Sequence, residues 1–578
     1  MPVENLAASR IGESWPAIDP AEVDRLLCCP GAPFEVTVSQ LFDQPTRTWK
    51  NAVPNLAALA EIGRANGSAD FLVYRDERVT YEGWYRAAAT LAQRLRALGI
   101  RKGDRVALAM RNLPEWPIAF FSITAIGAIC VPLNAWWTGS ELVYALCDSA
   151  SGTLICDDER YERLKPHLDA VEELDRVIVT RATGDLGGAV ALEELIGTSA
   201  DYESLSPISL PAEQIDPDDE ATILYTSGTT GFPKGAVNTH RNLTTHIQTT
   251  AYFAARALLL RGVAIPAVPA PPALLIAIPL FHVSGCAAGM MGAIAAGGKI
   301  VLMHKWDAER ALQLIEEEKI TFTGGVPTIA WQLVDHPARE CYDLSSLVSV
   351  GYGGAPSAPD LVRLIHQHLG AMPGNGWGMT ETTGTVLSHT AEEYMRAPTS
   401  CGRPVPVAEV QIMSADGESQ ARRGEVGELW ARGPMVAKGY WRNPEATAAT
   451  FVDGWVRTGD LARMDEDGYV YIVDRIKDMI LRGGENIYTA EVENILCAHA
   501  AVVDASVVGL PHRTLGEEPV AAVTLGTGSS ASEEELMQWA SEHLAAFKCP
   551  VRIIIQTEPL PRNASGKILK DEVRRLFG

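Results

Sequence analysis

The segment YTSGTTGFPKGAV occupies residues 225–237 and follows the apolar run of residues 221–224. It gathers glycines and small hydroxyl side chains around one lysine, Lys234. Short side chains let backbone N–H groups close around an anion, so the segment predicts a loop that binds a phosphate chain. The P-loop of nucleotide hydrolases needs G-x-x-x-x-G-K-[ST], and no Gly-Lys-Ser or Gly-Lys-Thr occurs here. A flexible linker fits poorly, because the segment follows a strand-like run.

Composition excludes several classes of protein. The chain has 578 residues with 47% hydrophobic content, which is enough to bury a large core in at least two structural units. A formal net charge of −23 argues against nucleic acid and anionic membrane surfaces as partners. Ten cysteines without a C-x-x-C pair, and ends without a recognisable targeting signal, indicate a cytoplasmic protein.

Strand-like and helix-like patterns alternate through most of the sequence, which favours an α/β architecture. Residues 118–137 carry no charge and are long enough to suggest a membrane span. Gly127, Pro132 and Asn134 interrupt this stretch. We therefore expect a buried helix followed by a short strand, and no membrane span.

The last hundred or so residues have the pattern of a separate unit. The segment DRIKDMILRGGEN, residues 474–486, mixes charges and glycines between two structured regions and indicates a domain junction. Beyond it, Ser532 and Glu535 precede apolar residues at helical spacing. This spacing predicts a capping box at the start of a helix.

Further motifs follow the glycine-rich loop in sequence. They are GGAP at residues 353–356, GWGMTE at 376–381, TGD at 458–460, DRIKD at 474–478 and PRNASGK at 561–567. In this order they resemble the adenylate-forming acyl-CoA synthetase family, from about residue 70 to residue 578. The resemblance implies an α/β fold with a large N-terminal adenylate-forming domain of mixed sheets and flanking helices, residues 1–474, and a small mobile α+β C-terminal domain, residues 475–578.

The resemblance also implies a reaction and its small-molecule partners. A carboxylic acid attacks the α-phosphate of ATP, pyrophosphate leaves, and the acyl group passes from AMP to coenzyme A, with Mg²⁺ as cofactor. Small residues in segment 286–298 are consistent with a hydrophobic acid, and we expect a medium- or long-chain fatty acid. An aryl acid is the alternative, followed by a luciferase-like monooxygenase or a carrier-protein ligase. A homodimer is left open.

Four residues match the catalytic positions of the family. Lys567 would bridge the substrate carboxylate and the phosphate, Glu381 would bind Mg²⁺ together with Thr226, and Thr380 would donate to the phosphate. His282 would shield the carboxylate end of the acyl pocket. The positions that match ATP- and AMP-binding residues are Thr226, Ser227, Gly228, Thr229, Thr230, Gly231, Lys234, Gly353, Gly354, Ala355, Pro356, Trp377, Asp460 and Arg475.

Other matched positions concern the acid and coenzyme A. Those of the acyl pocket are His282, Ser284, Gly285, Val326, Tyr352 and Gly378. By the resemblance, the C-terminal domain rotates about Lys477 after adenylation, which withdraws Lys567 and brings Gly483 and Gly484 to line the tunnel for coenzyme A.

The sequence departs from the usual family pattern at several positions. Trp377 stands where tyrosine is usual, which keeps a face for stacking on adenine but removes the hydroxyl group. Thr489 replaces a proline, and we expect it to cap the helix that follows. Lys570 replaces an arginine, and an Ala/Pro-rich stretch at residues 263–272 puts the depth of the acyl pocket in question.

Overall fold

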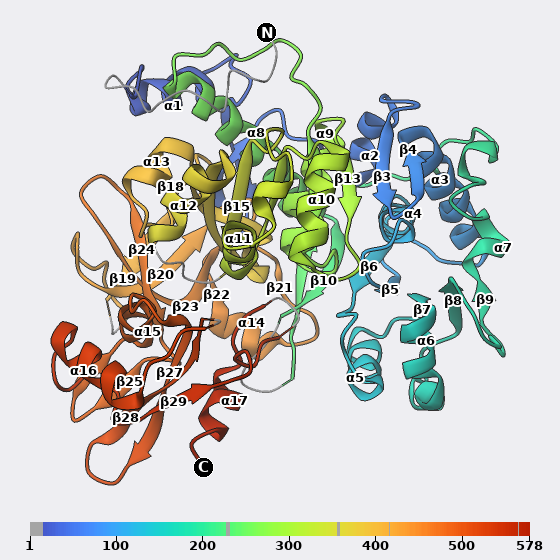
Figure 1. Ribbon diagram of the computed structural model, residues 1–578. Helices are drawn as coiled ribbons and strands as arrows, with labels where there is room; N and C mark the ends of the chain where they lie inside the picture. The colour runs from blue at the N-terminus through green and yellow to red at the C-terminus, as the bar shows by residue number, and fades with distance from the viewer. Residues whose placement is uncertain (1–14, 227–231, 355–358, 415–416, 527, 564–565) are drawn as a thin grey trace.

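The computed structural model describes residues 15–226, 232–354, 359–414, 417–526, 528–563 and 566–578 (Figure 1). Two large sheets with flanking helices form most of the molecule, and a smaller C-terminal unit lies below them in Figure 1. The helices are α1 Pro20–Cys28, α2 Leu56–Arg64, α3 Tyr81–Ala97, α4 Glu115–Thr124, α5 Gly139–Ser149, α6 Asp158–Leu164, α7 Leu192–Ile196, α8 His240–Leu260, α9 Gly292–Ala295, α10 Ala308–Glu318, α11 Pro327–Val334, α12 Pro359–Leu369, α13 Ala391–Arg396, α14 Pro444–Thr450, α15 Thr489–Cys497, α16 Glu533–His543 and α17 Lys570–Arg575.

The first large sheet has eight strands in the order β21-β11-β10-β6-β5-β7-β8-β9. Their bounds are β5 Arg105–Ala109, β6 Ile129–Pro132, β7 Thr153–Asp157, β8 Arg176–Thr180, β9 Val190–Ala191, β10 Glu220–Tyr225, β11 Gly235–Thr239 and β21 Gly439–Tyr440. In this order, the six strands that begin with β10 and end with β9 are parallel to their neighbours. β11 and β21 add antiparallel strands at the other edge. The apolar run before the glycine-rich loop is thus the central part of β10.

The second large sheet has nine strands in the order β18-β17-β16-β15-β14-β12-β13-β3-β4. Their bounds are β3 Asp70–Tyr74, β4 Glu77–Thr80, β12 Ala273–Ile276, β13 Lys299–Leu302, β14 Phe322–Gly325, β15 Ser349–Gly353, β16 Met372–Met379, β17 Gly384–Thr390 and β18 Arg403–Pro404. The strands from β3 to β16 are parallel to their neighbours in this order. Together the two sheets confirm the predicted α/β class with mixed sheets.

The main hydrophobic core lies between the two sheets. It includes residues of the first sheet such as Leu108, residues of the second such as Leu72, and the apolar faces of α2, α3 and α4. All residues of α4 are buried, and β6 follows it directly, which confirms the buried helix and strand predicted from residues 118–137. Among the described residues, no helix combines the length and the apolar character that a membrane span requires.

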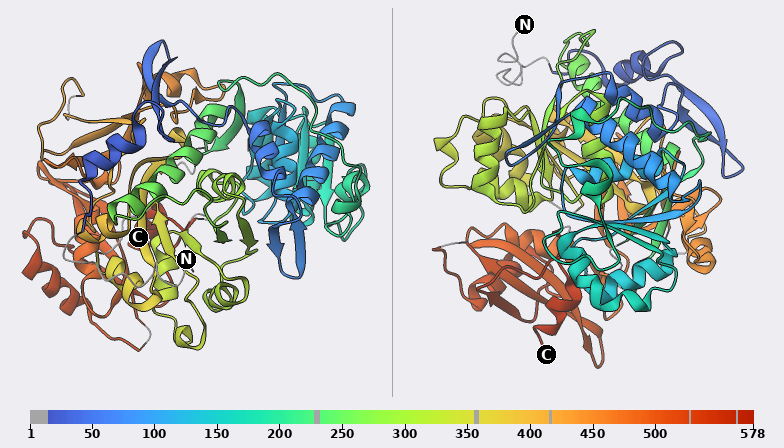
Figure 2. Two further views of the ribbon diagram at one scale, coloured as in Figure 1. Left: turned by 90° about the horizontal axis from the view of Figure 1, so that it is seen from above. Right: turned by 90° about the vertical axis from the view of Figure 1, so that its right-hand side faces the viewer.

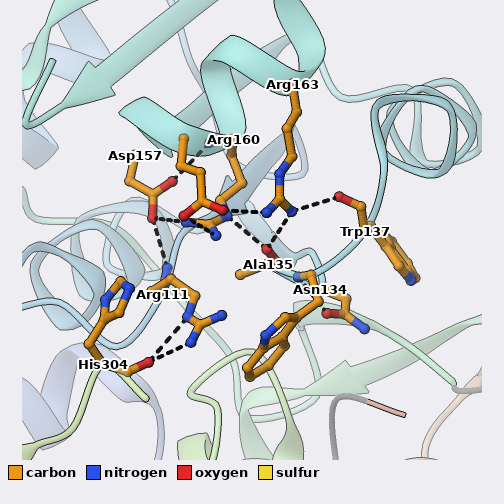
Figure 3. A network of polar contacts seen from close by, with 10 residues as sticks. Arg111, Asn134, Ala135, Trp137, Asp157, Arg160, Arg163 and His304 are labelled. Atoms are coloured by element: carbon orange, nitrogen blue, oxygen red, sulfur yellow. Dashed lines mark hydrogen bonds and ion pairs between the residues drawn. The ribbon is translucent and has the colours of Figure 1, made fainter. Parts of the chain in front are cut away.

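Arg111 ties the two sheets together where their strands end (Figure 3). It follows β5, and its Nη2 donates to the backbone oxygen of His304, just after β13, at 2.6 Å. Asp157, at the end of β7, accepts a hydrogen bond from the backbone of Arg111 at 3.0 Å and pairs with the buried Arg160 at 2.7 Å. The Arg160 Nε group also donates to the backbone oxygen of Ala135 at 2.8 Å. Because Ala135 follows β6, these bonds fix the ends of β5, β6, β7 and β13 relative to one another.

Two smaller sheets complete the chain. One contains β19 Glu409–Met413, β20 Gly427–Arg432, β22 Phe451–Val452, β23 Trp455–Met464 and β24 Val470–Arg475. The other, in the C-terminal unit, contains β25 Ile480–Arg482, β26 Glu485–Ile487, β27 Val502–His512, β28 Gly516–Leu525 and β29 Ile553–Gln556. A hairpin of β1 Val36–Leu41 and β2 Gln44–Trp49 stands near the beginning.

The C-terminal unit has its own hydrophobic core, between its sheet and helices α15 and α16, and forms a separate lobe in the right-hand view of Figure 2. The capping box of Ser532 and Glu535 is present at the start of α16, as predicted. Arg475 still belongs to β24, which pairs with β23, and residues 476–479 lead from there to β25. The predicted boundary between residues 474 and 475 therefore falls inside the last strand before this short connection.

Candidate active site

The described ends of the glycine-rich loop are joined by hydrogen bonds. Thr226 N donates to Lys234 O at 2.9 Å, and Lys234 N donates to Thr226 Oγ1 at 3.4 Å. The loop connects the antiparallel strands β10 and β11, and Gly235 has no room for a side chain, because a Cβ there would lie 2.5 Å from Ile223 Cγ2. Ser227, Gly228, Thr229, Thr230 and Gly231, which we expect to bind ATP, lie outside the described residues.

Glu381 is held by a residue that the sequence did not reveal. It follows β16 in the short turn that Thr380 begins, and it is 6% exposed. The Tyr440 hydroxyl donates to Glu381 Oε1 at 2.6 Å. Tyr440 lies in β21, next to the loop strand β11, and the Lys234 ammonium group is 4.9 Å from the centroid of its ring. Burial raises the pKa of Tyr440, and the Glu381 carboxylate raises it further, so the phenol remains a donor.

The donor atoms of the two expected ligands suit Mg²⁺. Glu381 offers carboxylate oxygens and Thr226 offers a hydroxyl, and Mg²⁺ prefers such oxygen ligands. Among the described residues there is no group of three or more His, Cys, Asp or Glu side chains that could hold a metal ion.

Asp460 is bracketed by two donors. It is 4% exposed and lies in β23, opposite Arg475 in β24. The Trp377 Nε1 group donates to Asp460 Oδ2 at 2.8 Å, and Arg475 Nε lies 2.8 Å from Oδ1. Oδ1 makes this ion pair but no regular hydrogen bond with the described residues. The tryptophan that replaces the usual tyrosine therefore supplies a donor as well as a ring face.

Lys567 of the C-terminal lobe reaches into the N-terminal part of the molecule. A Cβ at Gly354, just after β15, would lie 3.7 Å from Lys567 Cε, and a Cβ at Gly566 would lie 2.9 Å from Val326 Cγ2. Asn563 shapes the turn, because its Oδ1 accepts from Lys567 N at 3.0 Å.

The environment of Lys567 is unusual for a lysine. Burial lowers its pKa, and the positive charge of Arg475 lowers it further, while the carboxylates of Asp460 and Glu381 act in the opposite direction. The structure thus brings together the predicted residues Lys567, Gly354, Val326, Asp460, Arg475 and Glu381. Gly353 ends β15 beside Gly354, whereas Ala355 and Pro356 lie outside the described residues.

His282 and the segment around it are fixed by Asn112. The Asn112 side chain donates to Ile278 O at 3.0 Å and accepts from Leu280 N at 2.9 Å. Burial lowers the pKa of His282 to about 4, with a smaller contribution from Lys567, so its imidazole is neutral near pH 7. The sequence gave no signal for Asn112, because its partners lie more than 160 positions away.

The small residues after His282 form a π-helix, Ser284–Met291. Such helices are rare and often occur at functional sites. Gly285 is required here because a Cβ would lie 2.3 Å from Pro279 O, whereas Ser284 is exposed. Cys286, Ala287, Met290 and Met291 belong to the main core, so part of this composition serves helix packing.

The remaining pocket residues have clear structural environments. Tyr352 accepts a hydrogen bond from the Tyr394 hydroxyl at 2.8 Å, and both side chains are buried. Gly378 pairs with Thr385 across β16 and β17, and a Cβ at Gly378 would lie 1.8 Å from Gly384 O. Residues 262–271, which contain most of the Ala/Pro-rich stretch, are exposed between α8 and β12.

Two predicted features of the second half-reaction lie at the start of the C-terminal unit and in the connection that leads to it. Gly483 and Gly484 form the turn between β25 and β26, where their φ angles of 61° and 91° favour glycine. The backbone N–H of Gly483 donates to Leu515 O at 2.7 Å. Lys477 is exposed in the connection between the two parts of the chain.

Comparison with known proteins agrees with this arrangement. Residues 59–441 match the family described as AMP-binding enzyme, and residues 491–567 match the AMP-binding enzyme C-terminal domain. The chain belongs to the AMP-binding enzyme family. Adenylate-forming CoA ligase activity, which uses ATP, Mg²⁺ and coenzyme A, follows from this membership and from the relatives below.

Two curated relatives are named for different carboxylic acid substrates. A feruloyl-CoA synthase of Amycolatopsis sp. is 38% identical over 510 residues, covering 86% of this chain and 94% of that protein. A long-chain-fatty-acid–CoA ligase of Mycobacterium tuberculosis is 33% identical over 504 residues, covering 87% of this chain and 94% of that protein. The expected preference for a fatty acid is therefore not confirmed.

Two solved structures of similar enzymes contain bound acyl-adenylates. The o-succinylbenzoate CoA synthetase of Bacillus subtilis, in complex with its acyl-adenylate, has a TM-score of 0.74 and 30% identity, over 90% of this chain and 98% of that one. The anthranilate CoA ligase, in complex with anthranoyl-AMP, has a TM-score of 0.79 and 26% identity, over 90% of this chain and 96% of that one.

Proposed function

We propose that this AMP-binding enzyme activates a hydrophobic carboxylic acid as acyl-AMP with Lys567 as the main catalytic cation, and then acylates coenzyme A. The observation that carries the proposal is the position of Lys567, which comes from the C-terminal lobe and lies beside Gly354 under the influence of Asp460 and Glu381. A half-buried ammonium group at this point would attract the anions that the first step must bring together.

The first half-reaction needs positive charge and fixed donors. A carboxylate and a triphosphate repel each other, and preorganised donors in a site with little water reduce that repulsion most effectively. Lys567 would contact the oxygens of both reactants, and Thr380 would donate to the phosphate. Glu381 and Thr226 would hold Mg²⁺, which when bound neutralises phosphate charge. The neutral imidazole of His282 would stand beside the acid without adding a competing charge.

The nucleoside would be held by the pair of Asp460 and Trp377. Asp460 Oδ1 has no hydrogen bond in the described structure, so it can accept a ribose hydroxyl while Trp377 and Arg475 keep the carboxylate in place. The ring of Trp377 offers a face for adenine. Lys234 and the loop around it would contact the outer phosphates.

In the second half-reaction the thiol of coenzyme A attacks the acyl carbon, the bond to AMP breaks, and AMP leaves with the electron pair. In the described structure Lys567 lies beside Gly354, and it would have to withdraw before the thiol enters. We propose that the C-terminal lobe turns at Lys477, within residues 476–479, and that Gly483 and Gly484 then line the thiol's path. Because glycine has no side chain, neither residue would obstruct the thiol.

An aryl acid is the first substrate class to test, and a medium- or long-chain fatty acid is the second. The greater identity to a feruloyl-CoA synthase supports the first, and the fatty-acid ligase relative supports the second. The decisive experiment measures pyrophosphate release from ATP and Mg²⁺ over a panel of hydroxycinnamic, benzoic and fatty acids, with and without coenzyme A. Absence of pyrophosphate release and of any acyl-adenylate across the panel would refute the proposed function. Product analysis separates a CoA ligase from an enzyme that passes the acyl group to oxygen or a carrier protein.

A further inference from the structure

Asp474 is a buried carboxylate at the junction of the two parts of the chain. It lies in β24, three residues before Lys477, and is 6% exposed. Its oxygens accept hydrogen bonds from the backbone N–H and the hydroxyl group of Thr489, the latter at 3.1 Å. Thr489 is the first residue of α15 in the C-terminal lobe. These bonds therefore cross from the last strand of the N-terminal part to the lobe that carries Lys567.

Thr489 does not cap its helix, contrary to the sequence-based expectation. The N-cap is Tyr488, which makes no side-chain capping bond. The hydroxyl of Thr489 is instead occupied by Asp474 and by Lys570, whose Nζ donates to Thr489 Oγ1 at 2.6 Å. Lys570 also pairs with Glu493 at 3.0 Å.

Two departures from the usual family pattern thus contact each other. A proline at position 489 would have neither a backbone N–H nor a hydroxyl group, so it could not make either bond to Asp474. Lys570 is only three residues beyond Lys567, at the start of α17, and its ammonium group holds Thr489 in the position that serves Asp474. The contacts connect the catalytic lysine's own segment with the connection between the two lobes.

We propose that Thr489 and Lys570 form a latch on Asp474, which positions Lys567 for adenylation and opens before coenzyme A is acylated. The proposal rests on the proposed function, because it assumes two half-reactions with different positions of the C-terminal lobe. Thr489 and Lys570 are positioning residues: they act through Lys567 and need no contact with substrate.

The energetic scale suits a reversible latch. A hydrogen bond to a charged group contributes more than one between neutral groups, and removing one changes an equilibrium by about tenfold. The latch can therefore bias the position of the lobe without locking it. The backbone bond from Leu569 N to Pro561 O, at 2.8 Å, keeps Lys567 and Lys570 within one compact turn, so a bond at Lys570 also restrains Lys567.

The test uses the full-length enzyme with the variants Thr489→Val, which keeps the backbone donor, and Lys570→Met, which keeps the length of the side chain. Thr524→Val is the matched control, because the Thr524 hydroxyl lies in the same lobe and has no hydrogen bond in the described structure. Each enzyme is assayed for pyrophosphate release without coenzyme A and for CoA-ester formation from supplied acyl-adenylate. Hydrogen exchange over residues 476–492 gives a readout that does not depend on activity.

We expect adenylation to fall about tenfold or more in both latch variants, with CoA-ester formation from acyl-adenylate unchanged or faster. Hydrogen exchange over residues 476–492 should increase, and the Thr524→Val control should match the wild type in all three measurements. Equal loss in both half-reactions, or unchanged exchange, would overturn the latch. If the wild type makes no acyl-adenylate, the proposed function fails, and the exchange data alone then decide whether the contacts restrain the junction.

Discussion

Replacement of Tyr440 by phenylalanine should slow adenylation by removing one hydrogen bond. The Tyr440 hydroxyl donates to Glu381 Oε1 at 2.6 Å, and Glu381 is 6% exposed, so water has little access to replace the lost donor. A hydrogen bond to a charged group contributes about 1.5–3 kcal/mol, which corresponds to a loss of about 10- to 150-fold. The ring of Tyr440 remains beneath Lys234, so the aromatic contact is kept.

The assay for Tyr440→Phe is pyrophosphate release at a series of Mg²⁺ concentrations. Because Tyr440 orients the proposed ligand Glu381, we expect a higher Mg²⁺ requirement as well as a lower rate. Tyr471→Phe is the control, since the Tyr471 hydroxyl donates to the carboxylate of Asp465 at 2.9 Å. A Tyr440→Phe enzyme with the wild-type rate and Mg²⁺ dependence would refute the role of this hydrogen bond.

Three further predictions concern the same site and its stability. Lys567→Ala should raise the adenylation barrier by about 3–4 kcal/mol but spare CoA-ester formation from supplied acyl-adenylate, and equal loss in both steps would contradict its role. Trp377→Phe should weaken ATP binding about tenfold or more, because the Asp460 carboxylate loses its indole donor. Binding of 3′-deoxy-ATP, which lacks one ribose hydroxyl, should weaken less. Trp306→Phe, which loses an indole bond to Gln332, should change neither affinity in a binding titration. The free energy of unfolding should fall as pH drops from about 6.5 to 4. In this range four histidines bind protons in the unfolded chain but not in the folded one, where their pKa is about 4. Each histidine lowers the free energy of unfolding by at most about 1.4 kcal/mol per pH unit. The four are His240, His246, His282 and His389. The melting temperature of His389→Asn should depend less on pH than that of the exposed-site variant His543→Asn, and parallel curves would count against the explanation.

Local patterns predicted the parts of the fold that depend on neighbours in the sequence. The interruption of an uncharged stretch by Gly127 and Pro132 correctly indicated a buried helix and strand, because the period and length of such segments reflect burial. The capping box of Ser532 and Glu535 was likewise predictable, since its two bonds join residues three positions apart.

Contacts between distant segments could not be predicted in this way. Thr489 has the residue type of a helix cap, but a buried carboxylate fifteen positions earlier takes its hydroxyl group. Trp377 was expected only to stack on adenine, and its bond to Asp460 depends on the meeting of two different sheets. Tyr440 follows a glycine in an irregular stretch, so no periodicity marked it as a partner of Glu381. The family resemblance supplied candidate residues, while the structure supplied the partners that orient them.

The order of strands also has a consequence for how the protein is made. β3 and β4 leave the ribosome early, yet their inner neighbour in the sheet is β13, at residues 299–302. In the other large sheet, β11 gains its outer neighbour only when residues 439–440 have been synthesised. Unpaired strand edges promote aggregation during synthesis. A fragment that stops before residue 299 would therefore leave both edges unpaired. One that ends after residue 302 but before residue 439 would leave only the edge of β11 unpaired, directly beside the glycine-rich loop.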